Sequence, residues 1–255
     1  MPVAVGSATK VIQALHLIGK EYVCVMRLHE DVEGERIKKI CKEFTGPIYQ
    51  RPPIRSSVKR RLRVRRIYYL DVLEVEGRNV LLRIGCESGT YIRKLCHDIG
   101  EALGCGAHMR ELRRTRSGPF TERNMVTLHD LKDAYVFWKE EGDEAHIRKV
   151  LLPVEEGVQH LPKFFVRDSA VDAICHGADL AVPGVVKLED GVEKGDVVAI
   201  LTLKGELVAL GVALMTVEEV VREKRGIAVK TTRVIMSKGT YPKLWKSKKN
   251  SGSIT

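Results

Sequence analysis

The chain is poor in several residue types and patterns, and each shortage narrows the class of protein. Its 255 residues contain no run of about 18 apolar residues, so we expect no membrane-spanning helix. The first residues lack the basic start and apolar centre of a signal peptide, and we expect a cytoplasmic protein. No G-x-G-x-x-G loop occurs, which argues against an RNA methyltransferase with a nucleotide-type cofactor.

Cysteine is present but in no metal-binding pattern. The six cysteines form no C-x-x-C pair and match no zinc spacing. His97 and His108 lie near Cys96 and Cys105, so a metal cluster is one interpretation; small buried thiols are the simpler one, and we expect no metal. Asn and Gln number three each against 30% charged residues, a bias typical of heat-adapted proteins.

The chain has a large excess of positive charge, with a formal net charge of +10. A basic excess of this size favours an acidic partner, and nucleic acid is the commonest one. The charge is concentrated in RPPIRSSVKRRLRVRR, residues 51–66, where eight of sixteen residues are Arg or Lys and none is acidic. We expect its basic side chains to contact RNA phosphates, namely Arg55, Lys59, Arg60, Arg61 and Arg63. The alternative is a solvated edge strand whose charges prevent aggregation.

Periodicity and turn residues predict two regions of different character. Before residue 153 the pattern predicts helices at 8–17, 31–43, 90–104 and 129–141, and extended segments at 20–28, 67–76, 78–86 and 107–116. After the polar stretch at 153–163, short β-rich runs separated by glycines predict a small β-barrel.

Three groups of residues are candidates for function. Tyr22 lies inside a predicted strand, where an aromatic is more often core than catalytic. Tyr91 and Arg93 lie in the first turn of a predicted helix, where an arginine can hold a carboxylate or phosphate, although exposed arginines are common there. The third group combines glycine, aromatic and basic residues, a mixture suited to binding single-stranded RNA. The alternative is that these residues form ordinary turns and a strand of a β-barrel. The group consists of His176, Gly177, Ala178, Leu180, Tyr241, Trp245 and Lys246.

These segments together resemble one family. GPIYQRPPIRSSVKR is similar to the thumb-loop signature of the TruB-type pseudouridine synthases, and GTYIRKLCHDIGEALGCGAHMRELRRTRSGPF is similar to their second catalytic block. PVEEGVQHLP followed by HGADLAVPGVV resembles the start of a PUA domain in the branch of archaeal dyskerin homologues, which act in box H/ACA particles. The resemblance implies an α+β fold with a mixed, largely antiparallel sheet, followed by a PUA β-barrel. The expected bounds are 1–158 for the catalytic domain, 159–245 for the PUA domain and 246–255 for a polar tail.

The resemblance also implies a cofactor-free isomerisation of uridine to pseudouridine in ribosomal RNA, or in transfer RNA. In the family a uridine is flipped into the site and attacked by an aspartate. The implied roles are stacking on the base for Tyr22, pairing with the aspartate for Arg93 and packing against the base for Leu112. The implied partners are an H/ACA guide RNA, a substrate RNA and small accessory proteins.

One family feature is missing. The aspartate belongs to a G-T-L-D-P-type motif, and that motif occurs nowhere in these 255 residues. We therefore expect an N-terminally truncated domain that is inactive alone; the rival interpretation is a non-catalytic scaffold for the guide RNA. We also expect a stability cost at Arg93, because a buried guanidinium without its partner is unfavourable.

Overall fold

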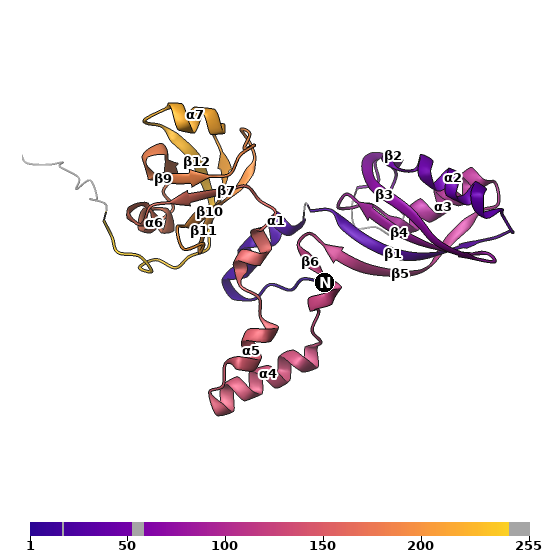
Figure 1. The fold of residues 1–255 in the computed structure, drawn as a ribbon, viewed down its shortest axis with the longest axis horizontal. Coiled ribbons are helices and arrows are strands. Elements are labelled where there is room, and N and C mark those ends of the chain that lie inside the picture. Colours follow the sequence, from indigo (N-terminus) through magenta and orange to yellow (C-terminus); the bar gives the residue numbers. More distant parts are fainter. Residues whose placement is uncertain (17, 53–58, 245–255) are drawn as a thin grey trace, which may run out of the picture. The chain divides into compact units, whose positions relative to one another are not determined.

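The computed structural model describes residues 1–16, 18–52 and 59–244 (Figure 1). The chain divides into two compact units, and each is described by itself. Unit 1 comprises Met1–Val3 and Leu15–Lys132, and unit 2 comprises Ala4–Ala14 and Asp133–Thr255. In the described ranges, no helix is long and apolar enough to cross a membrane.

Unit 1 is built on one six-stranded sheet with two helices against one face (Figure 1). Its strands are β1 (Lys20–Leu28), β2 (Gly46–Gln50), β3 (Arg63–Glu76), β4 (Asn79–Cys86), β5 (Ala107–Ser117) and β6 (Phe120–Thr121). Its helices are α2 (Gly34–Glu43), α3 (Ile92–Leu103) and the short 3-10 turn η2 (Glu122–Asn124). The strand order is β2-β3-β4-β1-β5-β6, and all neighbouring strands of this sheet pair antiparallel in the described residues.

Alternation along β1 explains why this face of the sheet is covered. Cys24, Met26 and Leu28 are buried at every second position, so they share one face of the strand. Helix α3 presents apolar residues at helical spacing to that face, among them Ile92 and Leu95. The resulting core fixes the strand that carries Tyr22 against the helix that carries Arg93.

Two glycines determine where α3 ends and how closely it packs. Gly104 has a φ of +77° and ends the helix in the left-handed region, as its position in the sequence predicts. A Cβ on Gly100 would lie 2.1 Å from the backbone nitrogen of Ala107, so a larger residue there would push α3 away from β5.

The start of α3 differs from the sequence expectation. Thr90, the first residue of the predicted helix, lies before the helix begins at Ile92, and its hydroxyl donates to the carbonyl of Glu87 at 2.7 Å. The N-cap residue is Tyr91, and its backbone is held by a side chain from β2. A local pattern identified the helix but could not identify a cap that comes from a distant strand.

Unit 2 contains the second six-stranded sheet, with strand order β8-β12-β11-β10-β7-β9. Its strands are β7 (Lys163–Val166), β8 (Leu180–Ala181), β9 (Val185–Leu188), β10 (Val197–Thr202), β11 (Leu207–Ala213) and β12 (Ile227–Val234). Its helical segments are η1 (Gly6–Val11), α1 (Ile12–His16), α4 (Leu128–Glu141), α5 (Ala145–Val150), η3 (Val154–Val158), α6 (Asp168–Cys175), η4 (Val182–Gly184) and α7 (Val217–Arg222). Helices α1 and α4 each run across a unit boundary.

The strands of this second sheet enclose a separate core around Phe164 and Ile200, both with no exposed surface. The β10–β7 pair is parallel, whereas the other strand pairs of this sheet are antiparallel in the part of the chain that the structure describes. Helix α7 begins with a full capping box between Thr216 and Glu219. The short, Gly-punctuated runs of the sequence thus form the small β-rich unit that they predict.

Candidate active-site face and nucleic-acid interface

Tyr22 and Leu112 lie on the same face of two neighbouring strands. In the β1–β5 pair, Tyr22 is opposite Arg114 and Cys24 is opposite Leu112, and side chains opposite each other point to one face. Helix α3 packs on this face, since the Cys24 and Cys96 sulfurs are 3.6 Å apart. Leu112 remains 41% exposed, so it is available to an apolar ligand.

Arg114 is a member of this face that the sequence analysis missed. Its guanidinium carbon lies 5.4 Å from the centroid of the Tyr22 ring, within range of a cation–π contact. The interaction leaves the tyrosine ring beside a fixed positive charge at an exposed position. Strand pairing could have identified Arg114, but only with the β5 register known.

The β5 register is irregular around these residues. It shifts between Glu21 and Tyr22 and again between Val25 and Met26. At the first shift the extra β5 residue is Thr115, whose hydroxyl donates to Glu21 at 2.7 Å. Leu112 and Arg114 therefore face α3 because of the shifts, and simple alternation along 107–116 would place them elsewhere.

The first turn of α3 is attached to the end of β2 by one buried side chain. Gln50 is 1% exposed and makes two hydrogen bonds to Tyr91. Its Oε1 accepts from the Tyr91 N–H at 2.9 Å, and its Nε2 donates to the Tyr91 carbonyl at 3.1 Å. The sequence analysis also missed this residue, although Gln50 directly precedes the basic segment that it singled out.

We expect Gln50→Ala to destabilise the chain by about 2–4 kcal/mol, because it removes both bonds and leaves a cavity. Urea unfolding followed by circular dichroism measures the loss. Gln159→Ala is the matched control: Gln159 is exposed and bonds to Glu156, so its loss should stay within about 0.5 kcal/mol. Equal effects of the two substitutions would contradict the role of Gln50.

Arg93 does not have the surroundings expected from the sequence. Its residue is exposed at the start of α3, and no hydrogen bond or ion pair to another described residue is present. The expectation of a stability cost at Arg93 is therefore wrong. The exposed guanidinium remains hydrated, so folding carries no desolvation penalty that a carboxylate partner would have to compensate. Tyr91, two residues before Arg93, is half-buried, and its backbone N–H and carbonyl are bonded to the Gln50 side chain.

The basic segment is exposed where the structure describes it. Lys59, Arg60 and Arg61 are exposed, Arg63 is half-buried at the start of β3, and Arg55 lies outside the described residues. None of these four described side chains forms an ion pair with a carboxylate of the described ranges. Arg65 differs, because its Nη1 is 2.9 Å from Glu87 and its side chain is 20% exposed.

The unit 2 loop after α6 contains the third group of candidates. His176, Gly177 and Ala178 are exposed, and Gly177 adopts a φ of +91° that favours glycine. The imidazole Nδ1 of His176 is 3.5 Å from the carboxylate of Asp172, which is 3% exposed. On the other side, the Thr231 hydroxyl donates to the Ala178 carbonyl at 2.8 Å, so β12 supports the loop.

Two residues expected in this group are corrected by the structure. Leu180 is 1% exposed, so its side chain belongs to the core and only its backbone could contact a ligand. Tyr241 is 8% exposed and donates from its hydroxyl to Glu206 at 2.6 Å, so its ring cannot stack on a base without leaving the core. Trp245 and Lys246 lie outside the described residues.

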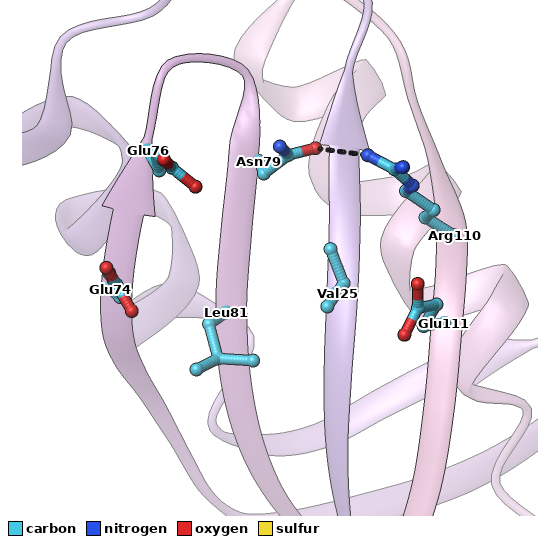
Figure 2. Close-up of a pocket in the computed structure, with 7 residues that line it drawn as sticks. All are labelled: Val25, Glu74, Glu76, Asn79, Leu81, Arg110 and Glu111. Atoms are coloured by element: carbon cyan, nitrogen blue, oxygen red, sulfur yellow. Dashed lines mark hydrogen bonds between the residues drawn. The ribbon is translucent and has the colours of Figure 1, made fainter.

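A pocket of about 300 Å³ lies on the sheet of unit 1, away from these candidates (Figure 2). It is lined by acidic, amide, basic and apolar side chains of four strands, namely Val25, Glu74, Glu76, Asn79, Leu81, Arg110 and Glu111. None of the residues expected at the site lines this pocket. Successive side chains of β1 point to opposite faces of the sheet. Tyr22 and Cys24 face α3, so Val25 points away from it.

Among the described residues, no group of three or more His, Cys, Asp or Glu is placed to hold a metal ion. All six cysteines are free thiols, and five of them are buried. His108, which the sequence placed near Cys105, instead contacts His29, with 3.0 Å between Nδ1 and Nε2.

Comparison with known proteins gives a consistent family assignment. Residues 1–92 match the TruB family pseudouridylate synthase (N terminal domain), residues 93–159 the tRNA pseudouridylate synthase B C-terminal domain, and residues 162–235 the PUA domain. A protein of Methanopyrus kandleri described as "Probable tRNA pseudouridine synthase B" is 63% identical over 245 residues, 96% of this chain and 72% of the relative. A Thermococcus kodakarensis protein of the same description is 61% identical over 97% of this chain and 74% of the relative.

Solved structures agree with these sequence matches. A Cbf5-Nop10-Gar1 complex contains a chain with a TM-score of 0.91 and 59% identity, covering 95% of this chain and 74% of that one. An H/ACA RNP bound to a substrate RNA containing 2'-deoxyuridine contains a chain with a TM-score of 0.89 and 56% identity, at the same coverage. These matches confirm the predicted fold class, a largely antiparallel α+β domain followed by a PUA domain.

Proposed function

The chain belongs to the TruB family of pseudouridine synthases, in its archaeal dyskerin-like branch, and on that premise we propose that it serves an RNA-guided uridine isomerase. The guide is an H/ACA RNA, the substrate is ribosomal or transfer RNA, and small accessory proteins assist. The observation that carries the proposal is the shared face of Tyr22 and Leu112, in a unit that also carries an exposed basic segment. Such a face can receive a flipped base while the basic side chains hold the backbone.

The described residues suggest how the face would work. Leu112 offers an apolar contact to one side of a base, and Tyr22 offers an aromatic ring whose position is fixed by strand pairing. The Arg114 guanidinium, 5.4 Å from the centroid of the Tyr22 ring, would help to hold that ring in place against a base. Arg93, exposed at the first turn of α3, is free to pair with a carboxylate or a phosphate.

A second candidate function has its own support. The 255 residues contain no aspartate in the G-T-L-D-P-type context that the family's chemistry uses. A polypeptide of these residues alone would then bind guide RNA without isomerising uridine. The two functions share the same RNA contacts and differ only in chemistry.

Guide recognition is proposed for the loop after α6, and it can be tested by RNA binding. We expect a hairpin RNA that ends in ACA to bind at least about ten-fold more tightly than the same hairpin ending in UGU, because the resemblance to the dyskerin branch implies that the PUA domain holds the ACA end of the guide and the loop after α6 is exposed. Ala178→Glu adds a charge at an exposed position and should abolish the preference. Fluorescence anisotropy at fixed salt measures both affinities.

Two further variants sharpen this test. Val221→Glu, at a side chain that is 76% exposed on α7, is the matched control and should keep the preference. Trp245→Ala should weaken binding by about 1–3 kcal/mol if its ring stacks on a base. Equal affinities of the parent chain for the two hairpins would refute guide recognition by this loop.

A further inference from the structure

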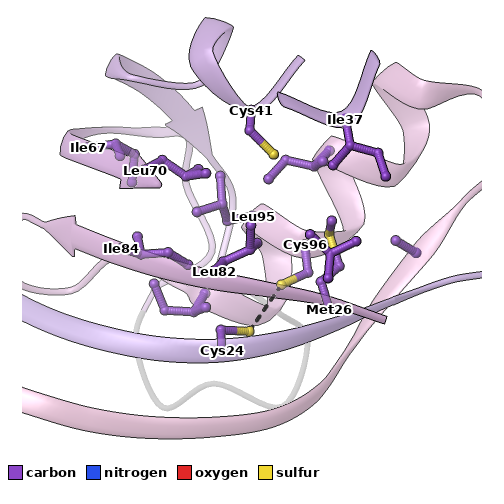
Figure 3. Close-up of a cluster of buried hydrophobic side chains, with 14 of the residues drawn as sticks. Cys24, Met26, Ile37, Cys41, Ile67, Leu70, Leu82, Ile84, Leu95 and Cys96 are labelled. Carbon is purple, nitrogen blue, oxygen red and sulfur yellow. Dashed lines mark hydrogen bonds between the residues drawn. The ribbon is translucent and has the colours of Figure 1, made fainter. Parts of the chain in front are cut away.

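Two cysteine thiols meet in the core of unit 1. Cys24 on β1 and Cys96 on α3 have 3.6 Å between their sulfurs, and neither side chain has exposed surface (Figure 3). They are 72 residues apart in the chain, so the contact joins elements formed by distant segments. The TruB assignment gives neither residue a role, and the cofactor-free chemistry does not need a thiol.

The distance is short enough for a covalent bond after a small movement. A disulfide requires about 2.05 Å between the sulfurs, so they would have to approach by about 1.5 Å through side-chain rotation or a slight shift of α3. Both residues are fixed on regular elements, and the same core holds two further buried thiols, Cys41 and Cys86 (Figure 3 labels Cys41). Cys41 is the alternative partner that a test has to distinguish.

We propose that Cys24 and Cys96 form a redox-active pair that closes to an intrachain disulfide linking β1 to α3. The oxidant is a small disulfide such as oxidised glutathione. The Cys24 thiolate attacks one of its sulfurs, a mixed disulfide forms, and one glutathione thiolate leaves. The Cys96 thiolate then displaces the second glutathione; the two thiols lose two protons, and the oxidant is reduced to two thiols.

The surroundings of the pair support this order of attack. The hydrogen bond between the two thiols lowers the pKa of Cys24, whereas the same hydrogen bond, together with burial, raises the pKa of Cys96. The contact therefore favours a thiolate at Cys24. Because both side chains are fully buried, reaction requires a local opening of the core, and it should be slow in the cold and faster with heat.

The cross-link would also act on the candidate site, a consequence that rests on the proposed function. Cys24 follows Tyr22 by two residues on β1, and Cys96 follows Arg93 by one helical turn on α3. A bond between them fixes the distance between the strand that bears the tyrosine and the helix that bears the arginine. Oxidation would hold the site in one geometry under conditions in which the core opens.

Peptide mapping tests the pairing directly. The full chain is incubated with oxidised glutathione at a raised temperature below its melting point, alkylated under denaturing conditions and digested with trypsin without reductant. Trypsin releases Cys24 in the peptide EYVCVMR and Cys96 in LCHDIGEALGCGAHMR. We expect these two peptides to be linked, and fragmentation to place the bond at Cys96 rather than Cys105.

Three variants and a melt complete the test. Cys24→Ala and Cys96→Ala should remove the link, and Cys175→Ala, a buried thiol of unit 2, should retain it. Oxidised parent chain should melt higher than reduced chain by roughly 5–15 °C, because the cross-link closes a long loop. Recovery of EYVCVMR only as the free alkylated peptide, or linked to the Cys41 peptide, would overturn the proposal, and the parent chain alone suffices for that result.

Discussion

A polypeptide of these 255 residues, supplied with guide RNA, substrate RNA and accessory proteins, is expected to produce no pseudouridine. Pseudouridine formation needs a nucleophile to break the glycosidic bond, and the family uses an aspartate for this step. Tyr22 and Arg93 cannot replace a carboxylate: one is a phenol within a strand and the other is a permanent cation. The expected loss relative to a complete enzyme is about a million-fold or more.

Mass spectrometry of the digested substrate RNA after chemical derivatisation of pseudouridine measures this outcome. The control is the same mixture with a polypeptide that adds a G-T-L-D-P-containing segment to the N-terminal side of these residues. Guide binding should be equal in the two mixtures, which separates loss of chemistry from loss of assembly. Turnover by the 255 residues alone at about 0.001 per second would sink the idea, since even slow enzymes work near that rate.

The second large effect is expected from the basic segment. Changing Lys59, Arg60, Arg61 and Arg63 together to Ala should weaken RNA binding roughly a thousand-fold at about 0.1 M salt and reduce the salt slope by about 0.7–0.9 per lost contact. The reason is that none of the four has a carboxylate partner among the described residues, and Lys59, Arg60 and Arg61 are exposed where phosphates can reach them. Filter binding over a series of salt concentrations gives affinity and slope together.

A charge-matched variant controls for the fall in net charge. Lys38, Lys39, Lys42 and Lys139 are exposed helix residues outside the basic segment, and their change to Ala removes four charges as well. This variant should bind RNA with nearly the parent slope. If both variants lose affinity equally, the segment contributes only to the general field of the protein, as a solvated edge strand would.

Local pattern was sufficient for most elements and for the family's sequence blocks. The strand at Lys20–Leu28 and the helix end at Gly104 follow from alternation and from a single glycine, because both depend on residues close in sequence. The α3 cap did not follow, because Gln50 reaches it from another strand. Arg114 was missed for the same reason: its neighbour Tyr22 lies on the paired strand.

Burial was the property that the sequence predicted least well. Tyr241 is an aromatic residue of a type that can stack on a base, but its hydroxyl donates to Glu206 and its ring is buried in the core. Arg93 shows the opposite error, since an expected buried ion is exposed. Both outcomes depend on which polar partner folding supplies, and residue type alone does not determine that.

The two register shifts on β5 have a consequence for insertions and deletions. Between the two shifts, at residues 111–114, the even-numbered side chains face α3. Before the shifts the odd-numbered residues 107 and 109 face it instead. A point substitution within this segment changes one side chain. Deletion of the extra residue Thr115 would join Arg116, opposite Glu21, directly to Arg114, opposite Tyr22, so the pairing would become regular and Leu112 and Arg114 would keep their face. Deletion of a residue between the two shifts would instead change the face of part of the segment, so β5 should tolerate loss of Thr115 or Arg110 better than loss of a residue at 111–114.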